Sequence, residues 1–319
     1  MRRIAATLAY AAYGIVATVS ADPNVPRTVR LVAAAPVGSG LDLTLRTLAE
    51  VLQRDLGAAV IVDNRPGGDG ILAAQFVMQA AADGGTLLAA SPAQMTINPV
   101  LRSALSYDPE RDFTPISMLS RVPLALVSSA SSRIDSMATL IRRAAADPGR
   151  IRYGSASSTF VVATEHFAEK AGIALEPIPY NGVPPVVNAL LAGDVDIAWV
   201  NLPPVLGHVR AGRLRVLAVD SQARDPSLPD APTLAEVGVP GYEFEVWVGA
   251  YAPAGTPPAL VRRMHAAFAS ALGDPEVRKR LTSAGIVPVA STPEALLERV
   301  RSERKMIERI ARTTGLAPR

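Results

Sequence analysis

The chain has 319 residues, of which 49% are hydrophobic and 19% are charged, and it carries a formal net charge of +3. This length and composition exclude a disordered chain and are sufficient for two domains with their own cores. The small net charge argues against a basic nucleic-acid-binding face, and the absence of cysteine excludes a fold held by disulfides.

The first 21 residues have the pattern of a cleaved signal peptide. Two arginines precede an apolar stretch that runs to about Val19. Small residues follow at the positions that a signal peptidase recognises before its cleavage site. A membrane anchor is the alternative, but two tyrosines and a glycine interrupt a stretch that is short for a span of about 20 residues. Cleavage leaves 30 basic and 29 acidic residues, and a secreted chain without cysteine fits the bacterial periplasm.

From residue 29 onward, short apolar runs alternate with helical patterns, as in a parallel sheet covered by helices. The first unit has expected strands at 29–34, 58–64 and 86–91, with helices at 41–57 and 71–85. A second unit has expected strands at 122–129, 151–155, 175–180, 195–201 and 214–219, with helices near 134–146, 161–171 and 183–192. The fold class is therefore predicted to be α/β, with two lobes.

After a proline-rich stretch, the chain has one strand-like run at 242–253 and helices at 257–272, 274–284 and 293–312. Too few strands remain for a third sheet, so this tail is expected to pack on the first lobe. The chain then crosses between the lobes twice, near 122–128 and 243–251, which predicts a hinge and a ligand cleft. The expected division is a signal peptide at 1–21, one lobe at 22–123 and 247–319, and the other at 124–246.

A loop of small residues, Gly38-Ser39-Gly40, joins the first expected strand to its helix. Ligands of open parallel sheets bind beyond the carboxyl ends of strands, where helix N-termini carry partial positive charge. We therefore predict that the Gly38 and Gly40 amides bind an anion and that Asp42 pairs with Arg46. A second such loop, at 153–159, opens a helix of the other lobe. The two loops together predict a small-anion site, although either could be a plain connection.

No catalytic or metal site is predicted from the sequence. It lacks a G-x-S-x-G motif and a P-loop lysine, and Leu43 stands where a dinucleotide-binding glycine would be needed. The histidines at 166, 208 and 265 are scattered, without metal-ligand spacing. We therefore expect no cofactor, no metal and no catalytic residue.

Ordered motifs along the chain include PVGSGLD (36–42), VDNRPGGDG (62–70), YDPERDFTPI (107–116), PYNGVPP (179–185) and GDVDIAWVNLP (193–203). From about 29 to 305 the chain resembles the extracytoplasmic solute receptors of tripartite tricarboxylate transporters, the Bug family. The resemblance implies a type II periplasmic binding protein fold with a two-crossing hinge. It further implies a monomer that closes on a small organic carboxylate and presents it to membrane permease subunits.

The resemblance also implies which residues contact the ligand, largely through backbone amides, hydroxyls and ordered water. The implied contacts are Pro36, Val37, Gly38, Ser39, Gly40, Leu41, Asp42, Ser91, Ala93 and Gln94 in the first lobe, and Ser155, Ser157, Ser158, Thr159, Asn181, Gly182 and Asn201 in the second. Asp42 is expected to anchor its helix. There are two alternatives. One is a receptor that presents the ligand to a sensor kinase, and the other is a periplasmic enzyme on this fold.

The second loop, SASSTFVVATEHF, is shorter than the family pattern, and a valine near Val161 replaces a histidine of that pattern. Phe160, Val161 and Val162 would give the cleft an apolar wall. Such a wall favours a monocarboxylate or an aromatic acid over a tricarboxylate, whose charges need more donors. Alternatively, these side chains form the core face of the helix.

Overall fold

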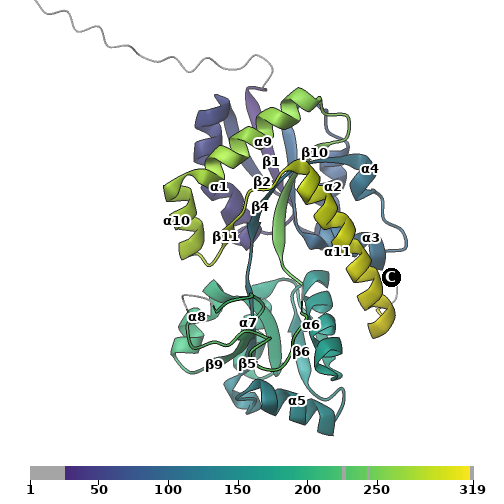
Figure 1. Ribbon diagram of the computed structural model, residues 1–319, viewed down its shortest axis with the longest axis vertical. Coiled ribbons are helices and arrows are strands. Elements are labelled where there is room, and N and C mark those ends of the chain that lie inside the picture. Colours follow the sequence, from purple (N-terminus) through teal and green to yellow (C-terminus); the bar gives the residue numbers. More distant parts are fainter. Residues whose placement is uncertain (1–25, 225–227, 243, 317–319) are drawn as a thin grey trace, which may run out of the picture.

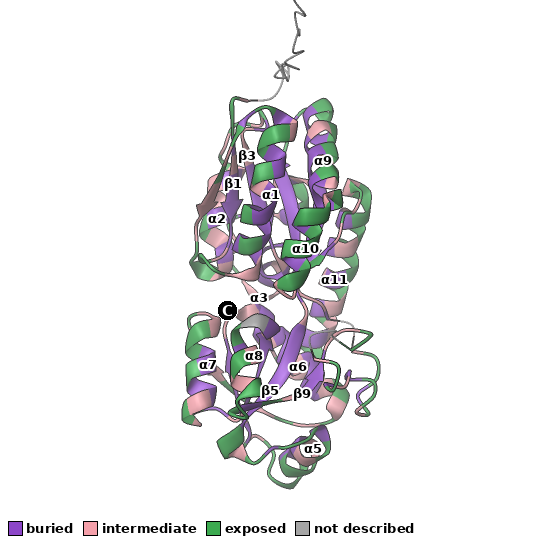
Figure 2. Ribbon diagram, turned by 90° about the vertical axis from the view of Figure 1, so that its left-hand side faces the viewer, coloured by how far each residue is buried: buried purple, intermediate pink, exposed green. Residues whose placement is uncertain are grey.

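The computed structural model describes residues 26–224, 228–242 and 244–316, which form two lobes along the long axis of the molecule (Figure 1). One lobe contains a six-stranded sheet and the other a five-stranded sheet. In each lobe buried strands lie between helices whose outer faces are exposed (Figure 2). The predicted two-lobe α/β fold is thus confirmed, whereas the predicted signal peptide at 1–21 lies outside the described residues.

The first sheet has the strand order β11-β4-β10-β3-β1-β2. Its strands are β1 (Thr28–Ala33), β2 (Ala59–Asn64), β3 (Thr86–Ala90), β4 (Phe113–Arg121), β10 (Trp247–Pro253) and β11 (Val287–Pro288). Strands β1, β2 and β3 are parallel, and β10 runs antiparallel between β3 and β4. Helices α1 (Gly40–Leu56), α9 (Pro258–Gly273) and α10 (Pro275–Ser283) pack on one face, and α2 (Ile71–Met78) packs on the other.

Helix α1 follows the local sequence rules for a helix that starts just after a buried parallel strand. The Ser39 hydroxyl accepts from the Asp42 amide and so caps the first turn. Leu45, Leu48 and Leu52 repeat at helical spacing and are at most 1% exposed in the lobe core. Gly57, with φ +64°, ends the helix in the left-handed conformation. The cap and the buried stripe fix the start of α1 relative to the sheet.

The second sheet has the strand order β7-β6-β8-β5-β9. Its strands are β5 (Leu124–Ser129), β6 (Arg152–Ser155), β7 (Glu176–Pro179), β8 (Ile197–Asn201) and β9 (Leu214–Val219). Strand β6 is parallel to β7 and β8, and β5 is antiparallel to β8 and β9. Helices α5 (Met137–Ala146) and α6 (Ser158–Ala171) pack on one face, and α7 (Val183–Ala192) and α8 (Leu202–Arg210) on the other.

Several elements differ from the sequence expectation. Strand β4 and helix α8 were not expected, because FTPISMLSR contains a proline and polar residues and LPPVLGHVR contains two prolines and a glycine. Helix α2 ends at Met78 rather than near 85. Short helical segments also occur at η1 (Gly68–Gly70), the π-helical η2 (Ala93–Ile97), α3 (Asn98–Leu101), α4 (Pro109–Asp112) and η3 (Ala130–Ser132).

The C-terminal helix α11 (Pro293–Thr314) lies along both lobes and runs beside α6 (Figure 1). Leu296 and Val300 pack in the core of the first lobe, as expected for the tail. Ile307 and Ile310 pack instead in the core of the second lobe, together with Ile97 of η2. Helix α11 therefore packs on the hydrophobic cores of both lobes. No helix within the described ranges is both long and apolar enough to cross a membrane.

Candidate functional site

The loops that follow the parallel strands of both lobes lie beside the short crossing between β4 and β5. In the first lobe, Ala33 of β1 pairs with Asn64 of β2 and Ala89 of β3, so the three following loops share one edge. In the second lobe, Leu124, just after the crossing, pairs with Asn201 at the end of β8. The predicted contact loops of both lobes therefore lie at sheet edges next to the crossing.

Asp42 is the structural anchor of the first loop. It is 2% exposed, and its Oδ2 accepts from the Gly38 amide at 2.9 Å. Its Oδ1 accepts from Arg46 Nε and from Asn64 Nδ2, each at 2.9 Å, which confirms the predicted pairing with Arg46. Although burial raises the pKa of Asp42, hydrogen bonds from Gly38, Arg46 and Asn64 hold it below its usual value.

The donors of the first loop differ from those expected. The Gly38 amide donates to Asp42 and is therefore already used within the loop, in contrast to its predicted role as a ligand donor. Gly40 and Leu41 occupy the first two positions of α1, where amides have no acceptor inside the helix. The described residues provide no acceptor for either amide. These two amides therefore remain available to bind an anion.

Gln94 shapes the loop that follows β3. It is 2% exposed, and its Oε1 accepts from the Ser91 amide at 2.8 Å and from the Ser91 hydroxyl at 3.0 Å. Its Nε2 donates to the Asp69 carbonyl at 2.7 Å. A Cβ on Gly70 would lie 2.2 Å from that nitrogen, so the close approach requires glycine. Gln94 thus links the loops after β2 and β3.

The second-lobe loops are also linked to one another. The Tyr180 amide donates to the Ser155 carbonyl at 2.8 Å, and the Gly182 amide donates to the Ala156 carbonyl at 3.2 Å. Ser157 is the N-cap of α6 but its side chain accepts no capping hydrogen bond. These bonds hold the loops after β6 and β7 beside the start of α6.

Phe160 and Val162 do not form the apolar wall that the sequence suggested. Phe160 is 9% exposed and Val162 is fully buried, and both belong to the hydrophobic core of the second lobe with Phe167 and Trp199. The alternative reading, in which they form the core face of α6, is correct for these two residues. These two side chains therefore give the cleft no apolar wall that would favour an aromatic ligand.

The predicted contact residues differ in how far each residue is buried. Pro36, Val37, Gly38 and Asn181 are exposed; Ser39, Gly40, Ser91, Ser157, Ser158, Gly182 and Asn201 are half-buried; Leu41, Asp42, Ala93, Gln94, Ser155 and Thr159 are buried. Leu41 packs in the lobe core, so only its backbone could contact a ligand.

Two residues at the end of β2 and in the loop after it, Asn64 and Asp69, were missed as site residues. Asn64 bonds Asp42 and the Ala35 carbonyl, and Asp69 contacts both Gln94 and the second lobe. The amide of Ser158 donates to Asp69 Oδ1 at 3.4 Å across the lobe junction. The glycine-rich sequence RPGGDG directly after a predicted strand was the available signal, because it ends at the same sheet edge as the first loop.

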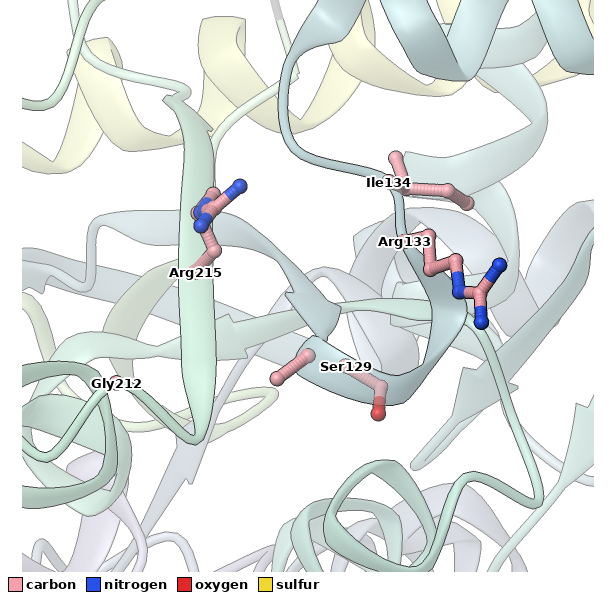
Figure 3. Close-up of a pocket in the computed structure, with 6 residues that line it drawn as sticks. Ser129, Arg133, Ile134, Gly212 and Arg215 are labelled. Atoms are coloured by element: carbon pink, nitrogen blue, oxygen red, sulfur yellow. The ribbon is translucent and has the colours of Figure 1, made fainter.

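Other features lie away from these loops. No group of histidine, aspartate or glutamate in the described part of the chain is arranged to hold a metal ion. A pocket at the far end of the second lobe (Figure 3) is lined by Ser129, Ala130, Arg133, Ile134, Gly212 and Arg215. Ser129 ends β5 at the end opposite the crossing. None of the predicted contact residues lines this pocket.

The two segments that join the lobes are bonded to each other. The Val122 amide donates to the Val246 carbonyl at 2.8 Å, and the Leu124 amide donates to Asp220 Oδ1 at 2.9 Å. Burial raises the pKa of Asp220 to about 8, and the nearby Glu245 carboxylate adds to this effect, against the Leu124 amide and Arg121. The hinge therefore holds a carboxyl group whose ionisation is unfavourable in the folded protein.

Asp220→Asn is expected to stabilise the protein increasingly as the pH rises. Between the ordinary pKa of aspartate and a pKa of about 8, the folded state holds a proton that the unfolded state has lost, so wild-type stability falls with pH. Asparagine cannot ionise and still accepts from Leu124, so its advantage grows by up to about 1.4 kcal/mol per pH unit. Urea denaturation at pH 5, 6.5 and 8 measures the difference, and a pH-independent difference would contradict the prediction.

Comparisons with known proteins agree with this arrangement. A family model described as "Tripartite tricarboxylate transporter family receptor" matches residues 44–316. Protein BugT of Bordetella pertussis is 34% identical over 305 residues, covering 95% of this chain and 94% of that protein.

Solved structures match over most of the chain as well. The structure of R. palustris Rpa4515 with adipate has a TM-score of 0.85 and 34% identity, covering 92% of this chain and 99% of that one. MatC of Rhodopseudomonas palustris with bound malate has a TM-score of 0.80 and 27% identity, covering 89% and 98%. A structure of the periplasmic binding protein BugD has a TM-score of 0.82 and 27% identity, covering 92% and 99%.

Proposed function

Because the chain belongs to the family of tripartite tricarboxylate transporter receptors, we propose that it captures one small organic carboxylate between its lobes and delivers it to membrane permease subunits. The observation that carries the proposal is the first loop, where Asp42 holds the backbone so that the Gly40 and Leu41 amides remain without an acceptor. Two such amides at a helix N-terminus can bind a carboxylate without an arginine.

The proposed site combines both lobes. The first lobe contributes residues 36–42 and 91–94, and the second contributes residues 155–159, Asn181, Gly182 and Asn201. The shared sheet edges beside the crossing support this grouping. The ligands named for two solved relatives, adipate and malate, support a small carboxylate as the ligand. The lobes are proposed to divide at residues 123/124 and 246/247, with α11 packed on both.

The receptor is proposed to act as a periplasmic monomer without catalytic activity. Its family consists of receptors, and one solved neighbour is described as a periplasmic binding protein. The pattern at 1–21 supports export by a cleaved signal peptide. Prolonged incubation with each bound acid, followed by mass spectrometry, tests the alternative of an enzyme, because a receptor returns the acid unchanged.

At least one small carboxylate is expected to raise the melting temperature by several degrees. A ligand specific to the folded state adds about 2.7 kcal/mol of stability at a hundredfold excess over its Kd. The measurement is a thermal-shift screen of mono-, di- and tricarboxylates on refolded protein, with adipate and malate included.

Neutral sugars and nucleotides serve as the controls in this screen. Neither class of compound has a carboxylate that could bind to the Gly40 and Leu41 amides. A shift with a sugar and none with any acid would overturn the proposal. A pull-down with permease membranes, with and without the bound acid, separates delivery to a transporter from delivery to a sensor kinase.

A further inference from the structure

Asp69 lies at the junction of the two lobes, between two residues proposed as ligand contacts. Its carbonyl accepts from Gln94 Nε2 at 2.7 Å in the first lobe. Its Oδ1 accepts from the Ser158 amide of α6 at 3.4 Å in the second lobe. The side chain is 19% exposed, so it lies largely inside the junction.

The backbone and side chain of Asp69 are held by the first lobe. Asp69 has φ +52°, a left-handed conformation that is uncommon for residues other than glycine. Asn98 Nδ2 donates to its carbonyl at 3.2 Å, in addition to Gln94. Arg102 Nη2 lies 2.9 Å from Oδ2. Since these contacts fix the residue and occupy Oδ2, Oδ1 is the oxygen presented to the second lobe.

The start of α6 lacks a side-chain cap that would accept hydrogen bonds from its first backbone amides. The Ser157 side chain makes no capping bond, and the Ser158 hydroxyl oxygen is buried without a hydrogen-bond partner. A negative group at a helix N-terminus is stabilised by the partial positive charge there. Asp69 therefore supplies, from the opposite lobe, the anion that this helix start would otherwise take from a ligand.

We infer that Asp69 determines specificity: its carboxylate excludes a second carboxylate from the α6 end of the cleft, so the receptor prefers acids with a single carboxylate. This inference rests on the proposed function of the same cleft. A ligand carboxylate placed at the start of α6 would compete with Oδ1 for the Ser158 amide and meet its like charge. A ligand with a neutral far end avoids both effects while its one carboxylate binds at α1.

The test compares hexanoate with adipate, which have the same carbon chain and differ in one carboxylate. Calorimetric titration of the wild type and of Asp69→Asn gives the ratio of the two dissociation constants. Asparagine can adopt the left-handed backbone conformation of Asp69 and has the same size as aspartate, but it carries no charge. In the variant Arg102 also loses its ion-pair partner and can attract the second carboxylate. We expect the preference for hexanoate over adipate to fall by about tenfold, which is about 1.4 kcal/mol.

Asp63→Asn is the matched control, because Asp63 is also a first-lobe aspartate paired with arginines, Arg30 and Arg65, at 3.0 Å each. It removes the same charge away from the junction and should leave the ratio unchanged. An equal change in both variants, or an unchanged ratio in Asp69→Asn while acids still bind, would overturn the inference and leave the proposed function intact. If the wild type binds only tricarboxylates, the inference is overturned and the proposed function stands; if it binds no carboxylate of the screen, both fail.

Discussion

Replacing Asp42 with alanine is expected to lower the free energy of unfolding by about 2 to 4 kcal/mol and to abolish carboxylate binding. The substitution leaves the Gly38 amide and Asn64 Nδ2 without the carboxylate that accepts from them. The backbone of the loop is then no longer held in the conformation that leaves the Gly40 and Leu41 amides without an acceptor. Urea denaturation and calorimetric titration measure the two effects.

Arg46→Gln is the control for the ion pair, and it also removes the exposed hydrogen bond from Arg46 Nη2 to Asn64 Oδ1 at 2.9 Å. Arg46 is 49% exposed, and exposed ion pairs contribute at most about 1 kcal/mol. We therefore expect this variant to lose little stability and to keep its ligand. If Arg46→Gln were as damaging as Asp42→Ala, the ion pair rather than the buried acceptor would be the important feature of the loop.

The sequence predicted those parts of the fold that depend on local pattern. Alternating apolar runs and helical periods placed the parallel strands of both lobes, and the Gly38-Ser39-Gly40 loop marked the start of α1. The i, i+4 spacing predicted the pair of Asp42 with Arg46. Each of these features depends on neighbours within about one helical turn or one strand, which is the range that periodicity reports.

Features that depend on tertiary contacts were missed. Strand β4 is polar and contains Pro115, yet it pairs with β10 along its length because Ile116 and Leu119 are fully buried. The role of Phe160 could not be read from its sequence, since a helix start and an apolar cleft wall have the same local pattern. Its burial beside Trp199 and Phe167 shows that it belongs to the hydrophobic core of the second lobe.

The candidate site was predicted at the level of loops but not of atoms. Gly38 and Gly40 are equivalent by residue type, and the sequence does not show that the Gly38 amide donates to the Asp42 carboxylate while Gly40 begins the helix. Asp69 lies 89 residues from Ser158 in the chain, and no sequence period connects positions so far apart. Glycines after a strand indicate that backbone is approached closely; they do not identify the partner.

Replacing Glu303 with alanine is expected to lower the free energy of unfolding by about 3 to 5 kcal/mol. Glu303 is 6% exposed and ties α11 to both η2 and β10: its Oε1 accepts from Thr96 Oγ1 at 3.0 Å, and its Oε2 accepts from Trp247 Nε1 at 2.6 Å. Arg299 Nε lies 3.6 Å from Oε2. Alanine leaves Trp247 Nε1 without its acceptor inside the protein and also opens a cavity, whereas Thr96 Oγ1 can still donate to the Pro92 carbonyl at 3.0 Å.

Glu303→Gln is expected to differ from the wild type by less than about 1 kcal/mol near pH 6 and to become relatively more stable as the pH rises. Glutamine can accept from Trp247 and donate to the Thr96 oxygen, while Arg299 keeps its bond to Glu245 at 3.1 Å.

Burial raises the pKa of Glu303 to about 7, against the opposing effects of Arg299, Trp247 and Thr96. From the ordinary glutamate pKa up to about pH 7, the folded wild type retains a proton that the unfolded chain has released, so its stability falls across that window. Glutamine does not titrate and escapes this loss. Denaturation curves at pH 5, 6 and 7.5 measure the effect, and a glutamine variant as unstable as the alanine variant at every pH would show that the buried charge itself stabilises α11.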